Sequence, residues 1–192
     1  METNYTRLYR VFHWTIAISF FLLLITIFLR LTWMNKNSVA GIIGTYLNET
    51  GQTLTQNQLL TLAKQIREPM WKWHLYIGYF LAGIFSLRFI LPLFGILKFQ
   101  NPLLKKLKMK ERFQKWVYVA FYLGVTLSLA TGLLMEFGPR SLKDTMEGVH
   151  VLSLYYLIPF ILIHLAGVIT AEISEQKGIV SRLLGGVKAT SS

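Results

Sequence analysis

The four histidines of the chain are the residues whose type and spacing could do chemistry, and all four lie at or within apolar runs. They are His13, His74, His150 and His164. His150 and His164 are fourteen residues apart. On a continuous helix this is close to four turns, so both imidazoles would leave one face about 21 Å apart along the axis. We expect such a helix to supply one ligand to each of two sites, the remaining ligands coming from other segments.

Apolar runs long enough to cross a membrane hold these histidines. The chain has 192 residues, of which 53% are hydrophobic. A membrane-spanning helix needs about 20 predominantly apolar residues, and runs of this kind cover about 7–30, 72–97, 114–136 and 148–172. We therefore predict an all-α fold, a four-helix transmembrane bundle, as a single domain over residues 1–192. No small-residue cleavage site follows the first run, so we expect a span rather than a cleaved signal peptide.

The charge of the chain indicates a topology rather than a nucleic-acid partner. The net charge is +11, and the basic residues gather in the gaps between the apolar runs. The segment 98–115 contains one acidic residue, Glu111. Its basic residues are Lys98, Lys105, Lys106, Lys108, Lys110, Arg112 and Lys115. Positively charged loops stay on the cytoplasmic side of a membrane. Four spans then place both termini on that side as well.

The connection from 34 to 70 is predicted to be a long outer loop. Gly41, Gly44 and Gly51 are typical of a loop. Within this connection, leucines between Thr55 and Arg67 suggest a short amphipathic helix that lies on the membrane or caps the bundle.

The predicted topology pairs the histidines by depth. His13 and His164 fall toward the inner face, and His74 and His150 toward the outer face. Two imidazoles in hydrocarbon suit the two axial positions of a haem iron, whereas zinc would require four ligands. The chain has no cysteine, which excludes disulfides, iron–sulfur clusters, thiolate zinc sites and thioether-linked haem. The alternatives are histidines that only form hydrogen bonds in the core, or a non-haem, proton-coupled transporter that uses them as a relay.

Arginines near the spans are candidate partners of haem propionates. Arg88 follows His74 by fourteen residues and lies inside an apolar run, where a carboxylate would compensate its charge. Its alternative role is to extend toward the cytoplasmic interface. Arg10 is a further candidate, together with Arg7, and anchoring at the interface is the alternative for both. Pro92 cannot donate a hydrogen bond to the carbonyl of Arg88, so we expect a local kink there.

Glycine and proline add two expectations about the spans. Gly78, Gly132 and Gly167 would let a flat ring approach the backbone or let helices pack closely. Pro159, between the two histidines of the last run, is expected to kink that helix.

Three motifs together resemble the bacterial cytochrome b561 family, which is related to the cytochrome b subunits of nickel–iron hydrogenases. They are Tyr-x-Arg-Leu-x4-His13-Trp at the start, His74-x3-Gly-x9-Arg88 in the second run and His150-x13-His164-Leu-Ala in the fourth. The resemblance implies a four-helix bundle with two haem b groups and electron exchange with the quinone pool. It implies iron ligation by His13 and His164 at the inner haem and by His74 and His150 at the outer haem. The connection 34–70 is longer than in the short form of the family.

The sequence therefore predicts an electron conduit in the bacterial inner (plasma) membrane. Ubiquinone or menaquinone is the expected substrate, lipid surrounds the chain, and a redox protein at one face is a further candidate partner. Each ligating imidazole is expected to use its second ring nitrogen for a carbonyl or hydroxyl. The alternative is a self-contained superoxide:quinone oxidoreductase, whose anionic substrate would be attracted by a basic outer pocket formed from Lys64, Arg67, Lys72, Arg140 or Lys143. No catalytic residue is assigned.

Overall fold

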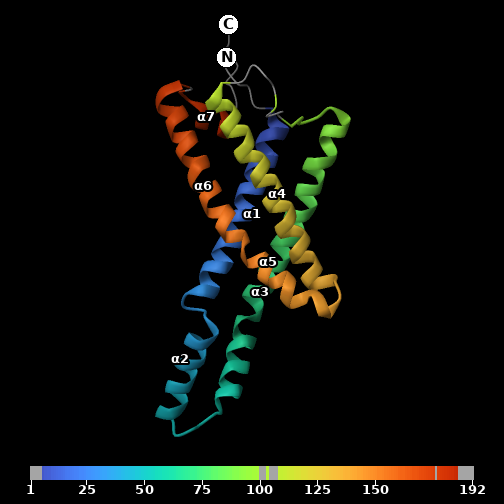
Figure 1. Ribbon diagram of the computed structural model, residues 1–192. Coiled ribbons are helices and arrows are strands. Elements are labelled where there is room, and N and C mark those ends of the chain that lie inside the picture. Colours follow the sequence, from blue (N-terminus) through green and yellow to red (C-terminus); the bar gives the residue numbers. More distant parts are fainter. Residues whose placement is uncertain (1–5, 100–102, 104–107, 176, 186–192) are drawn as a thin grey trace. The chain divides into compact units, whose positions relative to one another are not determined.

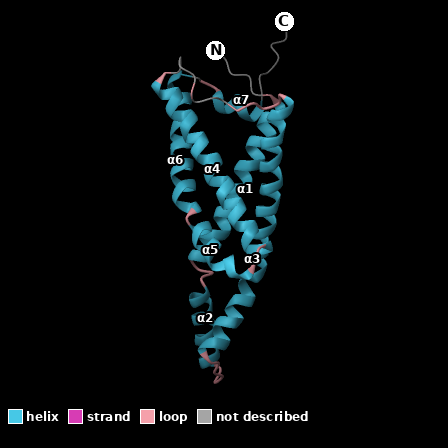
Figure 2. Cartoon of the chain, turned by 45° about the vertical axis from the view of Figure 1, so that its right-hand side comes forward, coloured by secondary structure: helices cyan, strands magenta, loops and turns pink. Residues whose placement is uncertain are grey.

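The computed structural model describes residues 6–99, 103, 108–175 and 177–185. Within this part of the chain the regular structure is helical, with short loops between helices (Figure 2). In chain order (Figure 1) the elements are α1 (Arg7–Leu31), α2 (Lys36–Glu49), α3 (Gln56–Ile90), η1 (Leu91–Phe94), α4 (Met109–Phe137), η2 (Arg140–Leu142), α5 (Lys143–Val151), α6 (Ser153–Thr170), η3 (Ala171–Glu175) and α7 (Ile179–Gly185).

Four segments of the described chain are long and apolar enough to cross a membrane. They are Arg7–Leu31, Gln56–Phe94, Met109–Phe137 and Arg140–Ser174. Large apolar side chains on them point outward, and Phe21 and Phe28 of α1 are 64% and 65% exposed. Such surfaces are suited to lipid, in which only a helix or a closed barrel satisfies its own backbone hydrogen bonds. In the described part of the chain, the predicted all-α fold with four candidate membrane-spanning segments is confirmed.

The chain divides into two compact units, which we describe separately. The first unit is His13–Leu87 and contains most of α1, all of α2 and most of α3. The second unit joins Met1–Phe12 to Arg88–Ser192 and contains α4 to α7. His13 and His74 belong to the first unit, and His150 and His164 belong to the second.

The prediction of a long outer loop over 34–70 was wrong, because two helices occupy this stretch. Helix α2 begins where the Asn35 side chain accepts a hydrogen bond from the backbone N–H of Asn37. Gly51, with a φ of 73°, helps the chain to turn back. Thr55 and Gln58 then form a capping box, in which the Gln58 amide oxygen accepts from the Thr55 N–H at 2.9 Å. These caps explain why helices form despite the glycines.

The predicted short helix Thr55–Arg67 is the first part of α3. With 35 residues, α3 is about 52 Å long, whereas the hydrocarbon core of a bilayer is about 30 Å thick. Part of α3 therefore projects beyond the membrane, where it packs against α2 (Figure 1). At Gly44 of α2, an added Cβ would lie 3.3 Å from the Leu59 side chain of α3. Gly44 is thus a packing residue of a helical hairpin.

The last span is also built differently from the prediction. Residues 148–172 were expected to form one helix bent at Pro159, but the break falls at Leu152, between α5 and α6. The N–H of Leu152 bonds to the Val149 carbonyl at 3.1 Å, a tighter turn than an α-helix makes. Pro159 lies inside α6. Because the break separates His150 from His164, the spacing argument based on one continuous helix does not hold.

Near Pro92 the expected irregularity is present. Helix α3 ends at Ile90 and continues as the 3₁₀ turn η1, which contains Pro92 in its first turn. Gly95, with a φ of 79°, closes that turn. The end of the second span is therefore a defined stop rather than a bend within a longer helix.

Candidate haem-ligand histidines

Within the first unit, His74 is fixed by a hydrogen bond to α1. Its Nδ1 lies 2.7 Å from Oγ1 of Thr26, a buried residue. The Thr26 hydroxyl has one proton, and it donates that proton to the Leu23 carbonyl at 2.6 Å. Toward His74 the hydroxyl must therefore accept, so Nδ1 of His74 carries a proton. In this neutral tautomer Nε2 has the lone pair that a metal requires.

A second contact fixes the plane of the same ring. Trp71, one turn earlier on α3, stacks on His74 with ring centroids 4.8 Å apart and planes only 3° from parallel. The imidazole is therefore constrained both by its hydrogen bond to Thr26 and by the indole face. Two independent constraints on one side chain are typical of a preorganised ligand.

His13, the other histidine of this unit, is half-buried on α1. Its ring meets that of Trp14 edge to face, with centroids 5.6 Å apart. The structure therefore gives a ring contact for His13 but defines its tautomer less closely than that of His74.

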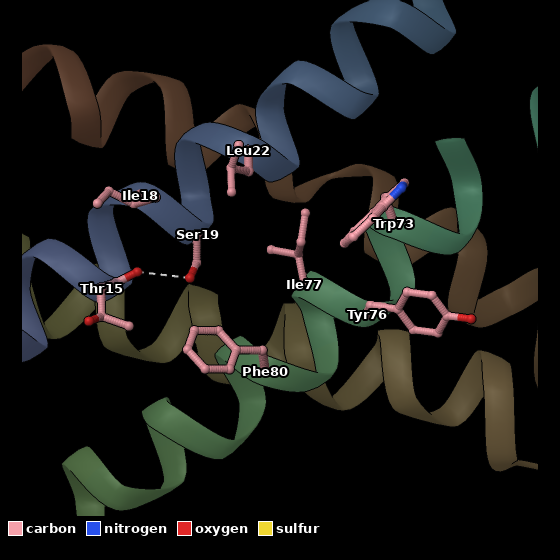
Figure 3. A pocket seen from close by; sticks show the side chains of 8 residues that line it. All are labelled: Thr15, Ile18, Ser19, Leu22, Trp73, Tyr76, Ile77 and Phe80. Carbon is pink, nitrogen blue, oxygen red and sulfur yellow. Dashed lines mark hydrogen bonds between the residues drawn. The ribbon is translucent and has the colours of Figure 1, made fainter. Parts of the chain in front are cut away.

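A groove of 390 Å³ follows the seam between α1 and α3 (Figure 3). Its floor includes Ser19, whose hydroxyl donates to the Thr15 carbonyl at 2.8 Å. The remaining lining is almost entirely apolar, and neither His13 nor His74 belongs to it. The side chains of His13 and His74 thus do not point into this groove.

Within the second unit, α4 fixes His150. Nδ1 of His150 lies 2.9 Å from the Ser128 carbonyl and 3.2 Å from Oγ1 of Thr131. Because a carbonyl only accepts, Nδ1 donates and Nε2 again has the lone pair. A Cβ on Gly132 would lie 3.2 Å from Cε1 of His150. At Gly132 it is therefore the imidazole of His150 that approaches the backbone, and the approach of a haem ring to this glycine stays a prediction.

His164 also contacts α4. Its Nδ1 lies 3.3 Å from the Tyr118 hydroxyl. Phe160, one turn earlier on α6, stacks on the His164 ring with centroids 5.7 Å apart. Phe160 in turn stacks on Phe121 of α4 at 3.9 Å. The ring is therefore held within an aromatic cluster between α4 and α6.

Helix α4 carries no histidine, yet it contacts both histidines of its unit, and sequence reasoning missed this role. At Gly124, a Cβ would fall 2.8 Å from two ring atoms of Tyr156, so α6 approaches α4 closely there. The Tyr156 hydroxyl lies 2.9 Å from Oγ of Ser128, whose carbonyl binds His150. Gly124-x3-Ser128-x3-Gly132 is a repeat of small residues at four-residue spacing, the pattern that allows close helix packing in membranes. This pattern in the sequence could have identified α4 as a helix against which others pack closely.

Comparison with known families identifies the family of the chain. The model of prokaryotic cytochrome b561 matches residues 4–186. The chain belongs to this family. Its members bind b-type haem and transfer electrons across bacterial membranes. No curated protein and no solved structure matches the chain.

The residues present fit a b-type haem. The group needs axial nitrogens with a lone pair, and the hydrogen bonds of His74 and His150 leave that lone pair on Nε2. Gly78 and Gly167 follow His74 and His164 by about one turn, and nothing described lies within 4 Å of a Cβ built on either glycine. These positions have room for a flat group.

Arg88, a candidate propionate partner, is buried, with 8% of its surface exposed. One guanidinium nitrogen donates to the Leu97 carbonyl at 2.7 Å, and the group lies over the ring of Phe99 at 4.2 Å. Leu97 has a φ of 52°, a conformation that is unusual for leucine. Arg88 therefore stabilises the end of the second span, and its remaining N–H donors are what a propionate could use.

Arg10 donates to the Leu184 carbonyl at 3.4 Å, near the end of α7. Its Nε is buried and makes no hydrogen bond within the described residues. Arg10 thus links the two terminal parts of the second unit. The role of either arginine toward a propionate stays a prediction.

The pairing of the histidines joins residues of different units. His13 and His74 lie in one unit, and His150 and His164 in the other. The pairs His13–His164 and His74–His150 therefore stay a prediction from topology and family resemblance. Two residues of the predicted basic segment, Lys105 and Lys106, lie outside the described residues.

Proposed function

We propose that this cytochrome b561 conducts electrons across the bacterial inner membrane through two b haems and exchanges them with the quinone pool. His13 and His164 would hold the haem nearer the cytoplasm, and His74 and His150 the outer one. The observation that carries the proposal is the donation of the Nδ1 proton by His74 and His150 to fixed acceptors. A histidine that ligates a metal commonly donates its other N–H in this way.

Haem iron supplies one-electron chemistry when bound, and the protein sets its conditions. Thr26 and the Ser128 carbonyl hold the proton on Nδ1, which fixes each ring and raises the basicity of Nε2. Trp71 and Phe160 keep the planes of His74 and His164 in place. Apolar helices would limit the access of water to these residues, and this access together with ligation would determine the redox potential.

Tyr118 is the residue that would orient His164. Arg88 and Arg10 would bind propionates on the same side of the membrane, because each has guanidinium donors beyond the carbonyl that it already binds. In this arrangement both termini face the cytoplasm, and ubiquinone or menaquinone reacts at one end of the conduit.

Proteoliposomes test the proposal directly. The purified protein is inserted into vesicles that contain ferricyanide, and a water-soluble quinol is added outside. We expect ferricyanide reduction that depends on the protein and falls to the rate of empty vesicles in His74→Ala and His164→Ala. Equal rates in empty vesicles and in vesicles with the unaltered protein would contradict transmembrane conduction.

The same preparation distinguishes the alternative function. Superoxide generated in the presence of quinone tests the self-contained superoxide:quinone reaction. Quinone reduction by the purified protein alone, with superoxide as donor, would support that reaction over a conduit that serves a separate redox partner.

A further inference from the structure

A stack of three side chains ends at the candidate ligand His74. The guanidinium carbon of Arg30, in the last turn of α1, lies 4.7 Å from the centre of the Trp71 ring. Trp71 in turn stacks on His74 at 4.8 Å. All three residues belong to the first unit. A positive charge is therefore held one aromatic ring away from a candidate haem ligand.

A second arginine lies beside this stack. Arg67 precedes Trp71 by four residues on α3, so the two side chains share one face of the helix. The Nε of Arg67 is buried and makes no hydrogen bond within the described residues. Arg30 and Arg67 thus lie on the two helices that meet beside Trp71, and both side chains are partly buried.

The carboxylate closest in sequence is engaged elsewhere. Glu68 forms an ion pair with Lys72 at 2.8 Å. Like charges at short range repel each other, and a buried N–H donor without an acceptor costs free energy. An anion with two oxygens would remove both penalties, because guanidinium groups bind carboxylates through paired hydrogen bonds.

We propose that Arg30 and Arg67 form a binding site for a carboxylate or another small oxyanion, next to Trp71 and His74. The anion has two sources of the same chemistry. One is a propionate of the haem held by His74, in which case the inference rests on the proposed function. The other is a small anion from the aqueous phase, such as an anionic substrate.

The test uses the purified holoprotein with Arg30→Gln, Arg67→Gln and Arg67→Lys. Lys36→Gln is the matched control, because Lys36 is exposed, lies six residues beyond Arg30 and loses the same charge. Three quantities are measured in each protein: the midpoint potentials of the haems, the melting temperature, and the response to sodium formate exchanged for sodium chloride at constant ionic strength. The haem at His74 is identified as the one lost in His74→Ala.

A propionate at the site predicts that both Gln variants lower the potential of the haem at His74 and lower the melting temperature, whether or not formate is present. A small anion predicts that formate shifts the melting temperature of the unaltered protein, with an apparent affinity weakened roughly tenfold or more in the Gln variants. Arg67→Lys should show either effect to a smaller extent than Arg67→Gln. It keeps the positive charge, but lysine lacks the planar pair of donors.

Two results would overturn the inference. In one, the arginine variants behave like Lys36→Gln in all three measurements. In the other, they raise the melting temperature without a change in potential or formate response, as relief of repulsion between two cations without a bound anion would do. Failure of the proposed function would give a different result. If His74→Ala kept all its haem, ligation by His74 would be contradicted, but the melting temperature would still show whether formate binds.

Discussion

Thr26 shows how one hydroxyl can set the chemistry of an imidazole. Its proton goes to the Leu23 carbonyl, so the His74 nitrogen that faces it must donate. The Ser128 carbonyl imposes the same tautomer on His150. At the scale of single residues, the candidate site is therefore defined by the acceptors as much as by the histidines.

Replacement of Thr26 by valine tests this assignment. We expect Thr26→Val to weaken haem binding at His74 roughly 10- to 100-fold and to raise the midpoint potential of the haem that remains, because the ligand becomes less basic. Haem content and redox titration measure both effects.

Thr32→Val is the control for this change. The Thr32 hydroxyl makes a similar bond to a carbonyl of α1, that of Phe28 at 2.7 Å, but no bond from Thr32 to a histidine is observed. Equal haem content and potential in the two variants would show that Thr26 does not orient His74.

The sequence alone identified the four histidines as candidate ligands and predicted a carbonyl or hydroxyl partner for each, and the structure shows such a partner for His74, His150 and His164. It did not identify Thr26 or Ser128, because these residues are 48 and 22 positions away from their histidines. Their contacts depend on how helices pack against each other, and apolar periodicity does not define that register.

At the scale of elements, α4 is the support of the second unit. Its face of small residues lets α6 approach at Gly124, and its Ser128 and Thr131 bind His150 of α5. A helix without histidines thus contacts the two helices that carry the candidate ligands His150 and His164.

Gly124→Ala tests the role of this close approach. The added methyl group would overlap the Tyr156 ring, so we expect a loss of stability of about 1–3 kcal/mol. The melting temperature in detergent and the visible haem spectrum should both show it. Gly41→Ala in α2 is the control, since a Cβ there meets nothing described within 4 Å. Equal melting temperatures in the two variants would argue against tight packing at Gly124.

The extents of the spans could be predicted because length and apolarity are local properties of the sequence. The error at 34–70 came from interpreting Gly41 and Gly44 as loop residues, although the Thr55–Gln58 capping box marked the start of a helix. The break at Leu152 had no local signal, because leucine is a good helix former.

At the scale of the whole molecule, the charges between the spans predict the topology. Lys108, Lys110, Arg112 and Lys115 lie in or beside the first turns of α4. The positive-inside rule predicts that this end of α4 faces the cytoplasm and that the turn between α2 and α3 faces outward.

Labelling of single cysteines tests this topology, and the chain contains no native cysteine that would interfere. We expect a membrane-impermeant maleimide to label Gln52→Cys in intact spheroplasts, and Arg112→Cys only after the membrane is opened. Both native side chains are exposed. Labelling of Arg112→Cys from outside would reverse the orientation.

The number of haems per chain tests the central claim most directly. A pyridine haem assay on the purified protein, with protein quantified independently, should give two b haems per chain. His150→Ala and His164→Ala should each reduce that number to one or fewer, because each histidine would serve a different haem. Undiminished haem in both variants would contradict the assignment of the ligands.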